Sequence, residues 1–336
     1  MNDAASGTVK QATVKGYQLL LRAAMSYESI FRSESKEAAF EETTKFVIQN
    51  MMDSLYKKLE TELLYGQDGI GIIAASPVPS ATSFAITAAE FAPGIWAGSR
   101  NMKIDLYNGV TLIGTGTVQR TDLNTKLVTL QGVGVAGADA GQKIYPAGAF
   151  GKQMKGMKKI MENTGVMFGI DAAQYELWEG TQFALPSPDV LSFAVVQQAI
   201  TKGVEKGLDK DVVVLCNPGH WDDLLTEQSA LKMYDSSYSS SLAENGAKSI
   251  KFHSQNGMVE IVPYIHVKQG HAFIVCPDDW RRIGSTDITF KRPGQADKYF
   301  HELSSHAGVE LRAYCDQALF CCRPGRQVLI TNLVVS

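Results

Sequence analysis

The stretch KEAAFEETTKFVIQNMMDSLYKKLETELLY, residues 36–65, decides the fold, and the glycine-rich GQDGIG, residues 66–71, follows it directly. Within the longer stretch every fourth residue is apolar, at Val47, Met51, Leu55, Leu59 and Leu63. This period predicts one amphipathic helix. Acidic residues near its start and lysines nearer its end suit the helix dipole. At about 1.5 Å per residue the helix would run roughly 45 Å, which indicates a spine rather than an ordinary globular helix.

The three glycines that follow raise the question of a phosphate-binding loop. Such loops place glycines before a helix, where free amide groups and the positive end of the dipole face the anion. Here Gly66, Gly69 and Gly71 come after the predicted helix, and no Gly-Lys-Ser/Thr motif follows them. We therefore interpret Gly66 as the left-handed residue that stops the helix, and the other two as a tight exit from it.

Composition indicates a soluble globular protein and excludes several classes. The 336 residues are 45% hydrophobic and 20% charged, enough for a sizeable core. The net charge of -3 provides no basic field that would attract nucleic acid. We find no run of about 18 apolar residues and no apolar secretory signal, so we predict no membrane span. The five cysteines are predicted to be reduced and mostly buried, as in a protein made in the cytosol.

Near the N-terminus, apolar residues alternate with more polar ones over residues 17–27. A period of two predicts a β-strand. With a return through residues 28–35, we predict that residues 10–35 form a long β-hairpin. Its apolar parity would have no cover unless another subunit supplied one.

After the long helix the sequence pattern changes twice, first to short strands and then to a mixture of helices and strands. Residues 84–149 predict an inserted β-module, a small antiparallel barrel or sandwich, with three strands in 103–130 joined by Asn108-Gly109 and by DLNT at 122–125. Residues 151–165 then predict a short basic helix. Helices at 187–209 and 218–234 flank a buried strand, VVVLCNP, and strands dominate from Ile250 onward. The fold class is therefore α+β.

The most tempting catalytic pattern is CNPGHWDD, which gathers Cys216, His220, Asp222 and Asp223. A thiol near a histidine base has the outline of cysteine catalysis. However, residues four apart across an Asn-Pro-Gly turn need not face each other. We favour the interpretation in which Cys216 ends a buried strand and His220 lies near a helix start. A zinc site would need two further ligands at recognisable spacing, and none appears.

Other charged groups carry weaker signals. Asp278–Trp280 and Glu302 could be drawn as an acid/base pair, but the sequence gives no shared pocket. Two clusters of basic residues are typical of a solvated face, and contact with an anionic partner is the alternative. The clusters are Arg281 with Arg282, and Lys152, Lys155, Lys158 and Lys159. We predict no catalytic residue, no metal and no cofactor.

Several phrases together point to a known family. They are LETELLYG at 59–66, NTGVMFGID at 163–171, VVLCNPGHWDDL at 213–224, and E-x-R-x-Y-x-D-Q-A from Glu310 to Ala318. In this order they resemble the major capsid protein of tailed double-stranded-DNA bacteriophages, the Hong Kong-type coat fold, over essentially the whole chain. The family's N-terminal arm is reduced here to a short stretch, so we expect a short arm or a processed form.

The resemblance implies an α+β capsid fold with an extended loop, a spine helix, axial and peripheral domains and an inserted β-domain. The implied map is 1–35 N-terminal segment and extended loop, 36–83 peripheral domain, 84–149 inserted domain, 150–164 connecting helix, 165–255 axial domain and 256–336 return to the peripheral domain. It also implies a non-enzymatic subunit whose pentamers and hexamers form an icosahedral shell around double-stranded DNA. Portal, scaffolding or decoration proteins would be its partners, in a virion assembled in the host bacterial cytoplasm.

The extended loop would supply the contacts between subunits. The residues expected there are Tyr17, Leu19, Leu21, Arg22, Met25, Tyr27, Glu28 and Arg32. Two alternatives stay open: an encapsulin-type shell protein of a bacterial nanocompartment, which shares the coat fold, and a soluble α/β hydrolase that uses Cys216 or His220.

Overall fold

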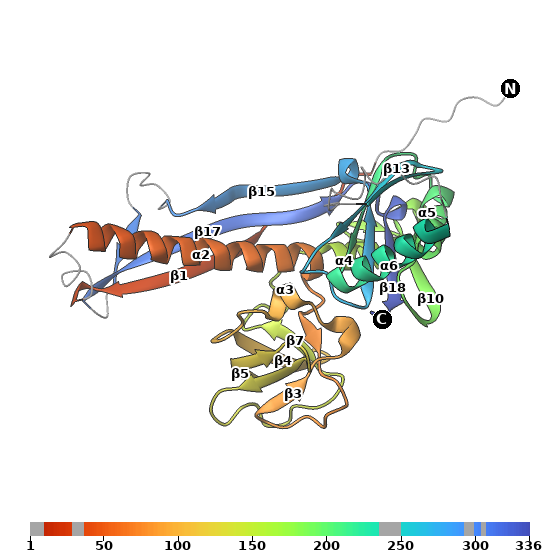
Figure 1. The fold of residues 1–336 in the computed structure, drawn as a ribbon. Helices are drawn as coiled ribbons and strands as arrows, with labels where there is room; N and C mark the ends of the chain where they lie inside the picture. Colours follow the sequence, from red (N-terminus) through yellow and green to blue (C-terminus); the bar gives the residue numbers. More distant parts are fainter. Residues whose placement is uncertain (1–9, 29–36, 235–249, 292–298, 304–306) are drawn as a thin grey trace.

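The computed structural model describes residues 10–28, 37–234, 250–291, 299–303 and 307–336. Three parts are visible in Figure 1: a long arm, a small β-structure beside it, and a mixed α/β layer at one end of the arm. We call them the arm, the barrel and the α/β layer.

The arm consists of one long helix lying on a four-stranded sheet: α2 (Glu37–Tyr65), β1 (Tyr17–Ser26), β15 (Trp280–Thr289), β16 (Phe300–Glu302) and β17 (Gly308–Cys321). The strand order is β1-β17-β15, with β16 also paired to β17. Met51, Leu55 and Leu59 are buried between helix and sheet, in one cluster with β1 and β17. The helix predicted over 36–65 is therefore confirmed. Its apolar residues at every fourth position form the side that faces the sheet.

The first strand of the hairpin predicted over residues 10–35 is confirmed as β1, and the predicted return strand lies outside the described residues. Strand β1 pairs antiparallel with β17, with Tyr17 opposite Gln317. Leu19, on the apolar side of β1, is covered by α2 of the same chain and is only 3% exposed, and Met25 on the same side is 9% exposed. The reason is that β17 presents its own apolar row on the same face, and the helix stripe covers both rows together. Residues 29–35 lie outside the described residues.

The barrel is a six-stranded antiparallel sheet formed by β2 (Gly71–Ile72), β3 (Ser83–Ala85), β4 (Lys103–Asn108), β5 (Thr111–Asp122), β6 (Leu127–Leu130) and β7 (Lys143–Pro146). Its order is β2-β7-β4-β5-β6-β3, and a bridge between Ile73 and Ile86 joins the two end strands, which closes the sheet. The three strands predicted within 103–130 are confirmed. The sheet begins at Gly71 rather than at residue 84, because β2 pairs with β7.

Two short helical turns lie between strands β3 and β4 of the barrel. They are η1 (Ala88–Glu90) and α3 (Pro93–Trp96). The ring of Trp96 is fully buried in the cluster that contains the barrel core and one face of the α/β layer.

The α/β layer contains a second six-stranded sheet, in the order β10-β18-β14-β11-β13-β12. Its strands are β10 (Thr181–Asp189), β11 (Val212–Cys216), β12 (Ile250–Ser254), β13 (Gly257–Pro263), β14 (His271–Val275) and β18 (Val328–Leu333). Helices α5 (Phe193–Glu205) and α6 (Pro218–Tyr234) share one apolar cluster with it. The helices predicted at 187–209 and 218–234, and the strand between them, are confirmed.

Shorter elements complete this end of the molecule: α4 (Met157–Met161), β8 (Val166–Met167), β9 (Ile170–Asp171), η2 (Glu176–Trp178), η4 (Pro277–Asp279) and η5 (Pro324–Arg326). The helix predicted over 151–165 is thus only five residues long. Strands β13, β14 and β18 belong to the α/β layer, and only β15 to β17 return to the arm.

The structure at the end of α2 shows why glycines follow this helix, but Gly66 does not have the predicted left-handed conformation. The left-handed residues are Gln67, with φ 66°, and Gly69, with φ 94°, whereas Gly66 is not left-handed. Gly66 is required for close approach instead. A Cβ there would lie 2.2 Å from the backbone oxygen of Met154, and Gly156 N donates to Gly66 O at 3.0 Å. The segment before α4 therefore lies directly on the end of α2.

Candidate functional site: a buried ionic cluster at the junction

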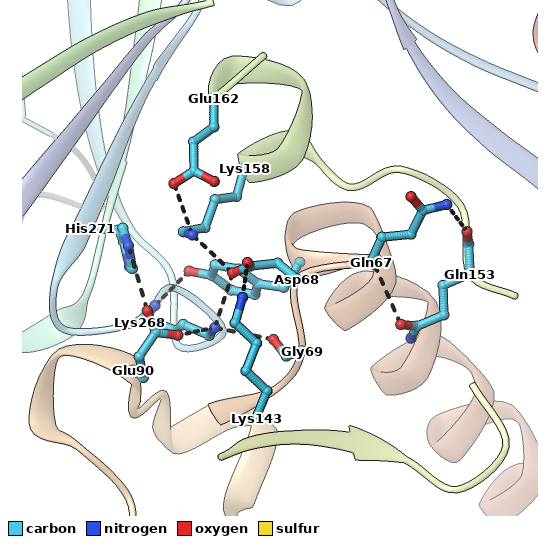
Figure 2. A network of polar contacts seen from close by, with 11 residues as sticks. Gln67, Asp68, Gly69, Glu90, Lys143, Gln153, Lys158, Glu162, Lys268 and His271 are labelled. Carbon is cyan, nitrogen blue, oxygen red and sulfur yellow. Dashed lines mark hydrogen bonds and ion pairs between the residues drawn. The ribbon is translucent and has the colours of Figure 1, made fainter. Parts of the chain in front are cut away.

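A cluster of charged side chains lies where the arm, the barrel and the α/β layer meet (Figure 2). Its carboxylates come from the turn after α2, from η1 and from the residue after α4; its lysines come from β7, from α4 and from the connection between β13 and β14. The acidic members are Asp68, Glu90 and Glu162, and the basic members are Lys143, Lys158 and Lys268. Three positive and three negative groups therefore face one another.

Asp68 is the centre of the cluster. Its Oδ1 lies 3.0 Å from the Nζ of Lys143, and its Oδ2 lies 2.9 Å from the Nζ of Lys158 and 3.8 Å from that of Lys268. Lys158 also pairs with Glu162 Oε1 at 2.9 Å. One carboxylate thus connects three lysines from three separate segments of the chain.

Lys268 is the most deeply buried charge, with a side chain that is 0% exposed. Its Nζ contacts the carboxylate of Glu90 and donates to Gly69 O at 3.1 Å. The same ammonium lies 4.3 Å from the centre of the Tyr65 ring, while the Lys268 backbone N–H donates to the Tyr65 hydroxyl at 2.8 Å. All these partners come from the exit of α2 and from η1, so Lys268 ties the α/β layer to both.

The electrostatics keep the carboxylates charged. Burial alone would raise the pKa of Asp68, but Lys268, Lys158 and Lys143 outweigh it and hold that pKa well below its usual value. Lys268 likewise lowers the pKa of Glu90 against the effect of burial. For Lys158, Asp68 and Glu162 overcome burial and raise the pKa to about 12. Asp68 and Glu90 are therefore ionised and Lys158 is protonated at neutral pH, each beside a group of opposite charge.

Two uncharged aromatic groups border the cluster. Burial lowers the pKa of His271 to about 3, although its Nε2 is 3.9 Å from Glu90 Oε1. Burial also raises the pKa of Tyr65 well above its usual value. The arrangement is a structural joint: it fixes three parts of the fold relative to one another and has no group poised for chemistry.

The candidate nucleophile and base do not form an active site. Cys216 ends β11 with no exposed surface, and burial raises the pKa of its thiol to about 12. His220 lies in the first turn of α6, where its Nε2 donates to Gln269 O at 2.6 Å and its Nδ1 faces Asp223 at 3.7 Å. Both are interior residues with structural partners, as the favoured interpretation predicted. Of the five cysteines only Cys322 is exposed, and all are free.

The other charged candidates also stay apart. Asp278 pairs with Lys210 at 2.8 Å, and Asp279 accepts a hydrogen bond from Gln327 at 3.1 Å. Glu302 lies at the far end of β17, opposite Val309. Arg282 pairs with Asp287 at 3.0 Å, and Arg281 donates to the backbone oxygen of Trp280.

The predicted solvated lysine face is wrong for Lys158, because α4 turns this residue toward Asp68. Lys152 and Lys159 are exposed, and Lys155 is half-buried with its Nζ 5.0 Å from the centre of the Phe168 ring. Within the described ranges, no group of three histidine, cysteine or acidic residues is arranged to hold a metal ion. In the same ranges no helix is long and apolar enough to span a membrane.

Stability should depend on pH through the buried histidines. The pKa of His271 is lowered to about 3, and burial also lowers those of His220 and His266. The unfolded chain therefore binds protons below about pH 6.5 that the folded chain does not, and stability falls as pH falls from there toward about 3. The expected slope is at most about 1.4 kcal/mol per pH unit for each histidine.

Urea denaturation of wild type and His271→Gln at pH 7.5 and 5.5 measures this effect. We expect the variant to lose about 1 kcal/mol less than wild type between the two values. His253→Gln, at an exposed position of β12, is the matched control and should keep the wild-type slope. An unchanged slope in His271→Gln would contradict the assignment.

Comparison with known proteins identifies the fold. No protein-family model matches the chain, and no curated protein sequence does. Among solved structures, the Cyanophage A-1(L) capsid asymmetric unit aligns with a TM-score of 0.51 and 12% identity, over 98% of this chain and 83% of that one. The Cyanophage P-SCSP1u capsid aligns with a TM-score of 0.43 and 7% identity, over 100% of this chain and 80% of that one. The satellite phage P4 procapsid aligns with a TM-score of 0.41 and 10% identity, over 100% of this chain and 79% of that one. The chain therefore has the fold of tailed-phage capsid proteins, as the resemblance implied.

Proposed function

We propose that this protein is a structural, non-enzymatic major capsid protein that self-assembles through pentamers and hexamers into an icosahedral shell around double-stranded viral DNA. The observation that carries the proposal is the likeness to a cyanophage capsid subunit over 98% of the chain, at a TM-score above 0.5. The buried joint supports it as well, because a shell subunit must hold its parts at fixed angles to fit several neighbours at once.

In this proposal the arm is the peripheral domain, the barrel the inserted domain and the α/β layer the axial domain. The subunit resides in the virion after assembly in the host bacterial cytoplasm. Portal, scaffolding or decoration proteins are its further partners, and it encloses DNA without reading its sequence. The net charge of -3 supports the last point, because tight DNA binding needs many phosphate contacts from lysine and arginine.

We further propose that the N-terminal segment makes contacts between subunits, but through the opposite side of β1 from the one first expected. Leu19 is buried under α2, with Tyr17 and Leu21 packed beside it, and Met25 is also buried; Arg32 lies outside the described residues. The outward parity holds Leu20, which is 51% exposed, and Arg22, whose side chain is 64% exposed. Among the described residues β1 is also an edge strand of its sheet, and an edge strand can pair with another chain.

Negative-stain electron microscopy of the purified protein tests assembly. We expect closed particles from wild type, and from Leu20→Asp/Arg22→Glu a folded subunit with few or no particles, because two charge changes would lie in each repeated contact. Lys251→Glu, at an exposed position of β12, is the control for a charge reversal elsewhere and should assemble normally. A wild-type protein that stays monomeric at all concentrations would contradict the capsid proposal; normal particles from the double variant would contradict only the proposed contact.

The same particles separate the alternatives. Viral particles should carry double-stranded DNA when isolated from infected cells, whereas a nanocompartment would carry enzyme cargo. Cys216→Ala should assemble as wild type does, since the thiol is an interior group with no exposed surface. Loss of a hydrolytic activity in that variant would favour the enzyme alternative.

A further inference from the structure

The barrel carries a cavity of about 490 Å³ that the proposed function does not use. It lies between the end of α3 and strands β5 and β6, and its lining includes Trp96, Ser99, Arg100, Gln119, Arg120 and Thr121. A volume of this size is within the range of about 300–1,000 Å³ that accommodates small ligands or a few side chains.

The backbone around the cavity is irregular in a way that gathers polar side chains. The pairing of β5 with β6 shifts register between Val118 and Arg120. In a regular strand adjacent residues point to opposite faces, whereas three consecutive residues, 119–121, line this cavity. Such bulges re-aim side chains and are common beside functional sites. Ser99 and Thr121 are joined across the cavity wall by a hydroxyl contact of 2.9 Å.

The charges of the cavity are unbalanced. Arg100 and Arg120 are both exposed, and across the described residues neither guanidinium forms an ion pair with a carboxylate. The nearby carboxylate of Asp122 accepts the backbone N–H groups of Asn124 and Thr125, at 2.9 and 3.3 Å. The indole Nε1 of Trp96 is buried and has no acceptor within the described part of the chain. The lining therefore contains two arginines and no carboxylate, while Asp122, outside the lining, interacts electrostatically with Arg120.

We propose that this cavity binds carboxylate side chains of an acidic segment on a partner protein. Guanidinium groups recognise carboxylates through paired, charge-assisted hydrogen bonds. Phosphates can be recognised in the same way, but those of duplex DNA lie along a wide rod that cannot enter a concave cavity. A glutamate side chain projects several ångströms from its backbone and can. The inference does not depend on the capsid proposal, because it rests on one subunit alone.

Isothermal titration at low ionic strength tests the site, with an acetylated and amidated tetraglutamate peptide as the probe. We expect wild type to bind the peptide, and Arg100→Gln and Arg120→Gln each to weaken binding about tenfold or more. Lys103→Gln removes one positive charge from an exposed position of β4, outside the cavity lining, and should change the affinity less than about twofold. All four proteins should unfold at the same temperature, because the three substituted side chains are exposed.

Three results would overturn the proposal. The first is no binding of the peptide to wild type. The second is a loss of peptide affinity in Lys103→Gln equal to that in the arginine variants, which would indicate that the peptide is attracted by the positive charge of the surface in general. The third is displacement of the peptide by inorganic phosphate at a much lower concentration than by acetate, which would assign the cavity to a phosphate ligand.

Discussion

Lys268→Met is expected to lower the free energy of unfolding by about 3–5 kcal/mol, the usual loss when one partner is removed from a buried ion pair. Methionine has a similar length and can fill the space beside the Tyr65 ring. It cannot donate to Gly69 O or compensate the carboxylates of Glu90 and Asp68, which stay buried. Guanidinium denaturation followed by circular dichroism measures the loss.

Two further variants make this result specific. Lys202→Met removes a lysine that pairs with Glu205 at 3.0 Å on the surface of α5, where both side chains are at least half exposed, so we expect a loss below about 1 kcal/mol. Glu90→Gln combined with Lys268→Met should cost less than the sum of the two single changes, because the second change removes the carboxylate that the first left uncompensated. A loss below about 1 kcal/mol in Lys268→Met would show that the cluster is not a joint.

The second large effect is expected from Gly66→Ala. The added methyl group would lie 2.2 Å from the backbone oxygen of Met154 and 2.6 Å from that of Glu62, and backbone atoms cannot rotate away as a side chain can. The end of α2 and the segment before α4 must then separate, at a cost of about 1–3 kcal/mol or more. Thermal unfolding should show a melting temperature several degrees lower.

Gly165→Ala is the matched control for this change. No atom lies within 4 Å of a Cβ at Gly165, and its backbone is not left-handed. We expect an effect within about 0.5 kcal/mol there. Equal losses at the two glycines would contradict the close approach to Met154 as the cause of the loss at Gly66.

The sequence predicted local structure well, because local structure depends on periodicity and turn residues. The fourfold spacing from Val47 to Leu63 identified α2, and Asn108-Gly109 identified the turn between β4 and β5. The period of two identified β1. These signals arise within a few residues of one another, so they can be read without knowledge of the rest of the chain.

Pairing between distant segments was not predictable in the same way. The sequence predicted a pairing of β1 with the residues after it and gave no sign of its pairing with β17, which lies almost 300 residues further along the chain. Likewise, the alternating apolar residues of β1 indicate that one face of the strand is buried. They do not indicate whether the same chain or another subunit buries it. The sequence alone could not choose between α2 and a neighbouring subunit.

The ionic cluster was missed entirely, and the reason is similar. Asp68, Lys158 and Lys268 are isolated charges in their own segments, and Lys158 lies in a basic run that is typical of a surface. What unites them is the convergence of three chain segments, which no spacing encodes. One signal was available: Asp68 stands between Gly66 and Gly69, in a turn whose tight backbone leaves little room for solvent.

The register between β1 and β17 also has a consequence for how the protein is made. During synthesis, residues 17–26 leave the ribosome long before residues 308–317, which they must meet. Until then β1 has no β17 to pair with, and α2 can cover only part of its apolar face. The sheet of the arm can therefore form only after residues 308–317 have been synthesised, late in the making of the chain.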